Sequence, residues 1–134
     1  MSRSDILFQS VNDFYKEPTN SQVLDDILEK KNGVSLRNLE WFVTNYSKLK
    51  NTTYTTKDGK QFSVHCSYKS TLGGYSKKLF DPFCRTKKVS FMLTHNNKTI
   101  NTTVAQLNFI RWCIKNNIID YMKENQSSLK KDYN

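Results

Sequence analysis

The chain has 134 residues, with 21 Lys and Arg against 12 Asp and Glu, which gives a formal net charge of +9 at pH 7. This length suits one domain with its own core, and the 13 % aromatic content indicates a core built around Phe, Tyr and Trp. No run approaches the ~20 apolar residues of a membrane span, and the polar N-terminus is unlike a secretory signal. We therefore expect a protein that is neither secreted nor bound to a membrane.

Three amphipathic helices are predicted in the N-terminal part of the chain. Apolar residues recur at helical spacing over 4–16, 21–32 and 36–49. Ser35 is the candidate N-cap of the third helix, and Gly33 is a C-terminal stop for the second. The first 50 residues are therefore expected to be helical.

A β-containing segment is predicted over residues 51–100. Asp58-Gly59 is a hairpin turn signal between the β-branched run 52–57 and the return strand 60–69, where apolar and polar residues alternate. A short helical turn at 75–80 and a strand at 88–93 follow. We therefore expect a small antiparallel sheet of about three strands, made of the hairpin 52–69 and the strand 88–93.

The C-terminal part reads as the strongest helix of the chain, over 102–122. Thr103 and Gln106 have the spacing of a capping box at its start. After it, residues 123–134 lose the apolar pattern and are expected to be a polar tail. The predicted fold class is α+β, with a single domain over 1–122 in which the sheet packs against helices.

Positive charge is concentrated in the middle of the chain. Residues 46–115 hold 13 Lys and Arg against only Asp58 and Asp81, a balance of +11, while the segments before and after balance to −2 and 0. Such a block is the electrostatic footprint of a polyanion-binding protein, most often one that binds nucleic acid. The candidate contacts are Lys57, Lys60, Lys69, Tyr75, Lys77, Lys78, Arg85, Lys87 and Lys88. The alternative is a solvated surface whose lysines reflect AT-rich codons.

Enzyme and metal signatures are weak in this sequence. The three cysteines and two histidines lack the close pairing typical of zinc sites, so no metal and no cofactor are expected. Cys84 is a candidate nucleophile because Arg85 is a basic neighbour, but no acid that would orient a catalytic base can be assigned. We therefore favour packing of Phe83 and Cys84 under the following strand. Without paired carboxylates or a phosphate-binding glycine loop, we expect a non-enzymatic protein.

Three stretches of the chain together resemble a known family. LEWFVTNYSK at 39–48, YSKKLFDPFCR at 75–85 and TTVAQLNFIRWCIKNNIIDYM at 102–122 are similar to a small uncharacterised protein family of nucleocytoplasmic large DNA viruses, the giant viruses of mimivirus-like or phycodnavirus-like type. The resemblance covers roughly the C-terminal two-thirds of the chain. It implies a viral origin and a setting in the host cytoplasm, at the virus factory, or in the virion. It implies no enzyme activity.

Two functions follow as expectations. The first is a basic viral protein that binds DNA, RNA or another polyanion through the 57–88 region. The second is a minor structural virion protein or a protein-interaction module that contacts viral capsid or core proteins. Trp41 and Trp112 are candidate anchors for such an interface, or for the core.

Overall fold

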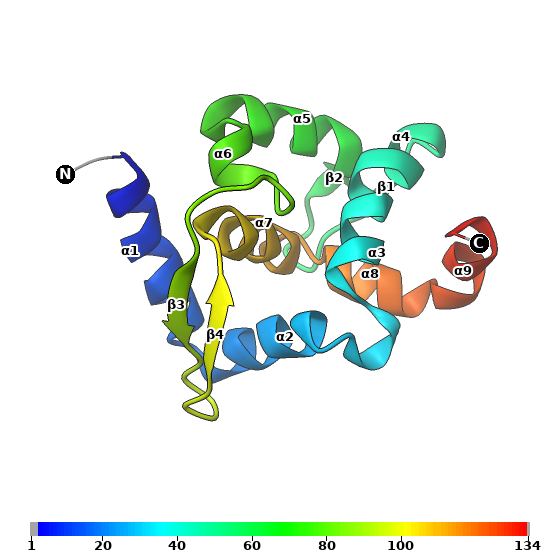
Figure 1. Cartoon of the computed structure of the whole chain (residues 1–134). Helices are drawn as coiled ribbons and strands as arrows, with labels where there is room; N and C mark the ends of the chain where they lie inside the picture. The colour runs from blue at the N-terminus through cyan, green and yellow to red at the C-terminus, as the bar shows by residue number, and fades with distance from the viewer. Residues whose placement is uncertain (1–2, 134) are drawn as a thin grey trace.

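Helices form most of the structure and surround one central helix, α7 (Val104–Lys115) (Figure 1). The computed structural model describes residues 3–133, so residues 1–2 of the predicted domain and residue 134 of the predicted tail lie outside the described residues. Every residue from Leu107 to Cys113 is buried. A helix that is buried on all sides belongs to a core, and helices α1, α2 and α6 pack against it.

The first and third N-terminal helices lie where the sequence predicts them, but the second covers Pro18–Leu28 instead of 21–32, because Pro18 suits its first turn, and Gly33 does not end it. Ser35 caps the third predicted helix by accepting a hydrogen bond from the backbone N–H of Asn38 at 3.1 Å, and Gly33 ends the preceding turn at φ +75°. The predicted helix 36–49 is continuous but contains one π-helical turn. The elements are α1 (Arg3–Tyr15), α2 (Pro18–Leu28), η1 (Lys31–Gly33), α3 (Leu36–Trp41), η2 (Phe42–Tyr46) and α4 (Ser47–Leu49).

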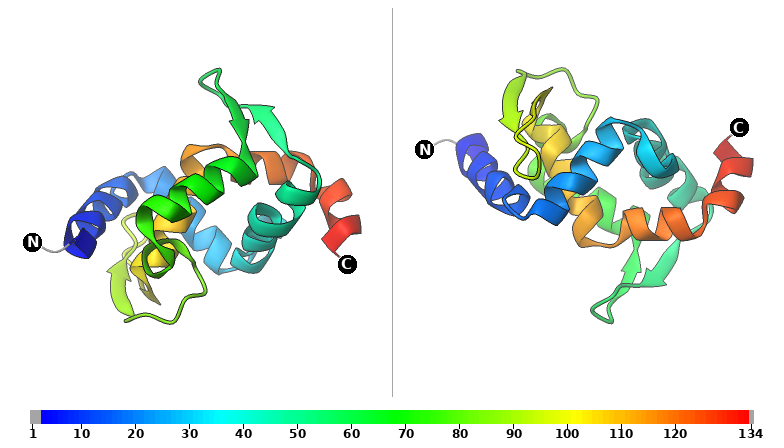
Figure 2. Two further views of the ribbon diagram at one scale, coloured as in Figure 1. Left: turned by 90° about the horizontal axis from the view of Figure 1, so that it is seen from above. Right: turned by 90° about the horizontal axis from the view of Figure 1, so that it is seen from below.

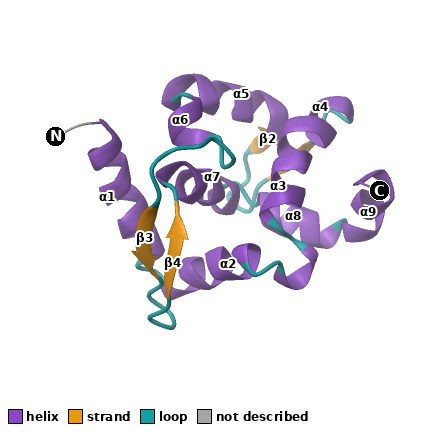
Figure 3. Ribbon diagram, viewed as in Figure 1, coloured by secondary structure: helices purple, strands orange, loops and turns teal. Residues whose placement is uncertain are grey.

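Within residues 3–133, four short strands form two separate antiparallel hairpins (Figure 3). β1 (Thr53–Thr55) pairs with β2 (Gln61–Ser63), and β3 (Val89–Met92) pairs with β4 (Thr99–Thr102). The α+β class is therefore confirmed. The single sheet of about three strands is wrong, because the 88–93 strand pairs with β4, a strand that the sequence analysis did not predict.

The predicted return strand 60–69 is correct only for its first residues. From Val64 the chain turns into helix α5 (Val64–Tyr75). Val64, Tyr68 and Leu72 fit an alternating pattern and a helical one equally, and all three pack on the core, but Cys66, which alternation would place on the same face, is exposed. Gly73 and Gly74 both lie inside α5, which ends only at Tyr75.

The C-terminal region is longer and more broken than predicted. Thr103 caps α7 by accepting from the N–H of Gln106 at 3.1 Å, as the sequence predicts. Asn117, in the left-handed region at φ 59°, interrupts the predicted helix 102–122 and starts α8 (Ile118–Glu124). In place of the polar tail there is a further helix, α9 (Gln126–Tyr133), because Leu129 is buried and anchors it.

An aromatic cluster holds the middle of the chain on the central helix. Phe80, in the short helix α6 (Lys77–Phe80), is fully buried and lies 5.5 Å from the ring centroids of both Phe109 and Trp112. Tyr68 and Tyr75 of α5 lie 5.9 and 6.0 Å from the same ring. Aromatic burial of this kind contributes much of a small core, so α6 provides a fixed base for the loop that follows it.

Candidate nucleic-acid interface

The nine predicted contact residues do not form one patch. Lys57 and Lys60 lie in the β1–β2 turn, whereas Arg85, Lys87 and Lys88 lie in the segment between α6 and β3. Figure 2 shows the β1–β2 hairpin and this segment on opposite sides of the molecule. The others lie on the intervening helices: Lys69 and Tyr75 on α5, and Lys77 and Lys78 on α6.

The hairpin lysines are paired with the chain's own acids. The Nζ of Lys57 lies 2.9 Å from Asp120 Oδ2, and that of Lys60 lies 3.9 Å from Asp58 Oδ2. The hydrogen bond with Asp120 raises the pKa of Lys57 above its ordinary value. A hydrogen bond from Thr56 lowers the pKa of Asp58, which keeps that carboxylate charged. The hairpin tip therefore carries less net positive charge than its lysines suggest.

The segment 81–88, here called the basic loop, holds three of the predicted cations within four consecutive residues. Arg85, Lys87 and Lys88 are exposed, and among the residues that the structure describes no carboxylate lies within 4.0 Å of their charged groups. On α6, Lys77 has Asp81 at 3.8 Å. The basic loop thus concentrates cations that are available to an external anion.

The basic loop encloses a surface hollow of about 240 Å³. Arg85, Lys88 and Phe83 contribute to its wall, and Phe83 is 51 % exposed. The remaining lining residues are Pro82, Cys84, Thr86, Thr103 and Gln106. Cations and an exposed aromatic ring therefore share one concave surface.

Local hydrogen bonds fix the start of the basic loop to the central helix. The N–H of Phe83 donates to Asp81 Oδ1 at 2.9 Å, and the N–H of Cys84 donates to the Asp81 carbonyl at 3.1 Å. The side chain of Gln106, in the first turn of α7, donates to the Pro82 carbonyl at 3.1 Å. These hydrogen bonds therefore hold the start of the basic loop against the first turn of α7.

The exposed aromatic residue near these cations is Phe83, whereas the sequence predicts Tyr75. Tyr75 is half-buried and stacks on Phe80, with ring planes 17° apart, so one face of its ring is already covered. Phe83, for which packing under the next strand is predicted, is exposed instead. The Asp81-Pro82 turn ends α6 and directs the following residue outward. A Pro directly before an aromatic residue in a basic segment is the only sequence signal for this position.

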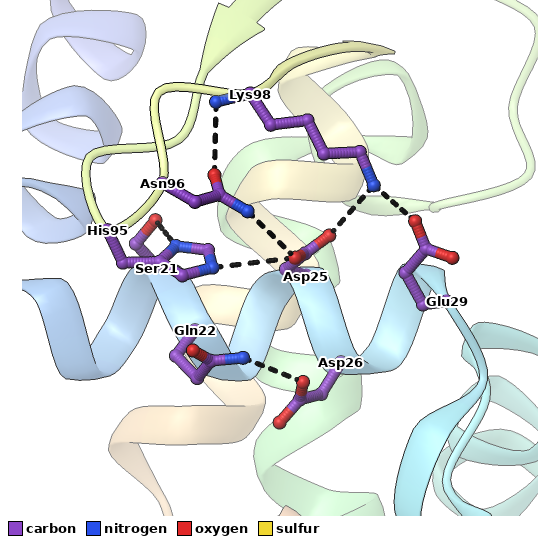
Figure 4. A network of polar contacts seen from close by, with 8 residues as sticks. All are labelled: Ser21, Gln22, Asp25, Asp26, Glu29, His95, Asn96 and Lys98. Atoms are coloured by element: carbon purple, nitrogen blue, oxygen red, sulfur yellow. Dashed lines mark hydrogen bonds and ion pairs between the residues drawn. The ribbon is translucent and has the colours of Figure 1, made fainter.

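A polar network lies elsewhere, between α2 and the β3–β4 turn (Figure 4). His95 from the turn lies between two residues of one helix face: its Nδ1 is 2.8 Å from Ser21 Oγ, and its Nε2 is 3.4 Å from Asp25 Oδ2. Asn96 and Lys98 each donate to the Asp25 carboxylate at 3.4 Å. Lys98 also pairs with Glu29, and that contact raises the pKa of Lys98.

The residue types of this network match a serine–histidine–aspartate triad, but their placement does not. A nucleophilic serine must reach a substrate, and Ser21 is fully buried. Asp25 is buried as well, and its charge is compensated by donors from the turn. We name Ser21, Asp25, His95, Asn96 and Lys98 the turn clamp, because they join the β3–β4 turn to α2. Sequence analysis missed this network because its two halves lie some 70 residues apart.

The three thiols have different surroundings. Cys66 is exposed on α5, Cys84 is half-buried in the hollow, and Cys113 is fully buried on α7. Burial raises the pKa of the Cys113 thiol well above its ordinary value. Within residues 3–133, no group of three or more His, Cys, Asp or Glu side chains is arranged to hold a metal ion. None of the helices in that range is both long and apolar enough to cross a membrane.

Comparison with known proteins places the chain among viral proteins. A family model described as a family of unknown function, DUF7197, matches residues 1–134. An uncharacterised protein of Acanthamoeba polyphaga mimivirus is 43 % identical over 113 residues, which cover 79 % of this chain and 44 % of that protein. The chain thus spans less than half the length of this relative. No solved structure matches. The resemblance to a giant-virus family is confirmed.

Proposed function

Because the chain belongs to DUF7197, a family of unknown function, we propose its activity from the site: it binds single-stranded nucleic acid through the basic loop. The observation that carries this proposal is the hollow in which Phe83, Arg85 and Lys88 lie together. An exposed aromatic face stacks on an unpaired base, and the neighbouring cations neutralise the phosphates on either side. Lys87 adds a further exposed cation within the same eight residues.

Charge and shape favour a single strand over a duplex. A two-stranded ribbon can enter the major groove of DNA, but the lysines at the β1–β2 turn are paired with Asp58 and Asp120. The basic loop offers a ring and a pocket instead of a protruding ribbon. Bases in a duplex are stacked on one another and cannot cover Phe83 without being unpaired. The proposal therefore predicts that a single strand binds more tightly than a duplex of the same length.

Fluorescence anisotropy with a labelled 12-mer of dT, its RNA equivalent and a 12-base-pair duplex tests the proposal at 50 and 200 mM KCl. Counterion release from a single strand gives a log–log slope of about −0.7 per phosphate, so three contacts predict a loss of roughly 20-fold across this range. Absence of binding at 50 mM KCl, or equal affinity for strand and duplex, would contradict it.

Two loop variants separate the two parts of the interaction. Arg85→Ala with Lys88→Ala should weaken binding and make the salt slope shallower by about 1.4. Phe83→Ala should weaken binding roughly 5- to 150-fold at both salt concentrations without changing the slope, because stacking releases no counterions. The matched control for the charges is Lys130→Ala with Lys131→Ala, two exposed lysines on α9. Leu49→Ala, at an 83 % exposed residue, is the control for the ring.

A further inference from the structure

Arg111 is a buried cation whose partners are all uncharged. The residue is only 9 % exposed, and its guanidinium donates to Ser10 Oγ at 2.7 Å, Asn108 Oδ1 at 2.8 Å and the Tyr75 hydroxyl at 3.4 Å. Within the part of the chain that the structure describes, no carboxylate lies within 4.0 Å of it. Buried charges in proteins are normally paired, as Asp25 is here with Lys98, and a guanidinium does not lose its proton to escape burial.

The guanidinium opens onto a cavity of about 230 Å³ where α1 meets the α5–α6 corner and the central helix. The other walls are mostly apolar, from Ile6, Leu7 and Leu79 with the ring of Tyr75. Ile6 is 56 % exposed, so the cavity has an apolar edge at the surface. One cation with the Ser10 and Tyr75 hydroxyls in a mostly apolar wall is typical of a ligand pocket, in which few polar groups fix the orientation of a largely apolar molecule.

We propose that this cavity binds a small organic carboxylate with a short apolar body, and that the carboxylate is the counterion of Arg111. A guanidinium has five N–H donors, of which the three uncharged acceptors account for three. Both Nη2 hydrogens are in use, so a carboxylate that binds the planar fork through two parallel hydrogen bonds replaces the longest contact, the one to the Tyr75 hydroxyl at 3.4 Å. The side chains of Leu7, Leu79 and Ile6 then cover the apolar body. The same walls disfavour a phosphate or sulfate dianion, because beyond Arg111 they offer only the Ser10 and Tyr75 hydroxyls to replace its hydration shell.

The proposal is tested on the full chain by NMR titration with hexanoate, and with hexanamide as the neutral probe of equal size. Hexanoate should shift the resonances of Arg111, Tyr75 and Leu79 with a dissociation constant near ~1 mM, as expected for a ligand of this size. Hexanamide should bind at least about tenfold more weakly, because it cannot neutralise the guanidinium. Acetate, which lacks the apolar body, should also bind more weakly. Equal affinity for hexanoate and hexanamide, or no shift at these three residues, would overturn the proposal.

A surface variant avoids the risk of unfolding that comes with replacing Arg111 itself. Ile6→Glu places a negative charge at an exposed position on the cavity edge, where it competes for the guanidinium and repels the ligand. We expect hexanoate affinity to fall at least about tenfold. Gln9→Glu, an exposed residue on the same helix that does not line the cavity, is the control with the same charge change. If Ile6→Glu and Gln9→Glu bind hexanoate alike, the site is not this cavity. Oligonucleotide binding at the basic loop should be the same in both variants, which separates this test from that of the proposed function.

Discussion

Replacing Asp25 with Asn tests whether the turn clamp stabilises the fold. The Asp25 carboxylate is buried and lies 3.4 Å from each of three nitrogens, those of His95 Nε2, Asn96 Nδ2 and Lys98 Nζ. An amide is nearly the same size as a carboxylate but carries no charge, so the substitution weakens all three contacts without opening a cavity.

The size of the effect follows from the geometry of these contacts. A hydrogen bond to a charged group is worth about 1 kcal/mol more than one between neutral groups. Three such differences would total about 3 kcal/mol, but the distances are long and Lys98 keeps Glu29 as a partner, so we expect about 2 kcal/mol. With an unfolding entropy of about 2.1 cal/mol/K per residue, a chain of 134 residues should lose about 7 °C in Tm.

Thermal unfolding followed by far-ultraviolet circular dichroism measures this loss. The matched control is Asp26→Asn, which makes the same charge change one residue further along α2, where the carboxylate accepts a hydrogen bond from the Gln22 side chain at 2.9 Å. Both substitutions change the net charge, and its interaction with the dipole of α2, almost equally. We expect the control to shift Tm by at most about 2 °C, as for other surface substitutions. If Asp25→Asn lies within this range of Asp26→Asn, the turn clamp does not stabilise the fold.

Two further predictions concern titration and thiol reactivity. Desolvation, with Lys48 and Lys69 nearby, lowers the pKa of His65 below 6.5, so its NMR titration midpoint should lie below that value. Below pH 6.5 the unfolded state then binds more protons than the folded state, so the free energy of unfolding should rise with pH in that window. His65→Asn should make this rise with pH less steep. A titration midpoint of His65 above 6.5 would refute the prediction. For the thiols, Cys66→Ser should remove the fast reaction of the native protein with Ellman's reagent, while Cys113→Ser should leave the native trace unchanged. A native reaction at Cys113 would show that α7 is not buried as described.

The helices with strong local signals are predictable from the sequence. Ser35 and Thr103 cap their helices where their positions indicate, because capping depends on a few neighbouring residues. Residues 64–69 at the start of α5 are predicted as a strand, because Val64 and Tyr68 share one face in either structure. The helix is favoured by long-range packing of Tyr68 against Phe80 and Trp112, and local spacing does not encode these contacts.

The candidate site shows the same limit. The positive charge of residues 77–88 is visible in the sequence, but its pairing is not, because Lys57 meets its partner Asp120 only in the folded chain. Exposure is equally hidden: Tyr75 and Phe83 are both aromatic residues in a basic segment, and only the fold covers the first and exposes the second. The cavity at Arg111 and the turn clamp likewise depend on helices that are far apart in sequence.

Photo-crosslinking locates the nucleic acid most directly. A single-stranded RNA that contains 5-iodouridine would be bound to the full chain at 50 mM KCl, irradiated, and digested with trypsin. The account predicts that the crosslinked peptide is LFDPFCR, residues 79–85, with Phe83 as the modified residue, because this ring is the exposed one beside Arg85 and Lys88. Crosslinks confined to the β1–β2 hairpin, or spread over the surface with none at Phe83, would contradict it.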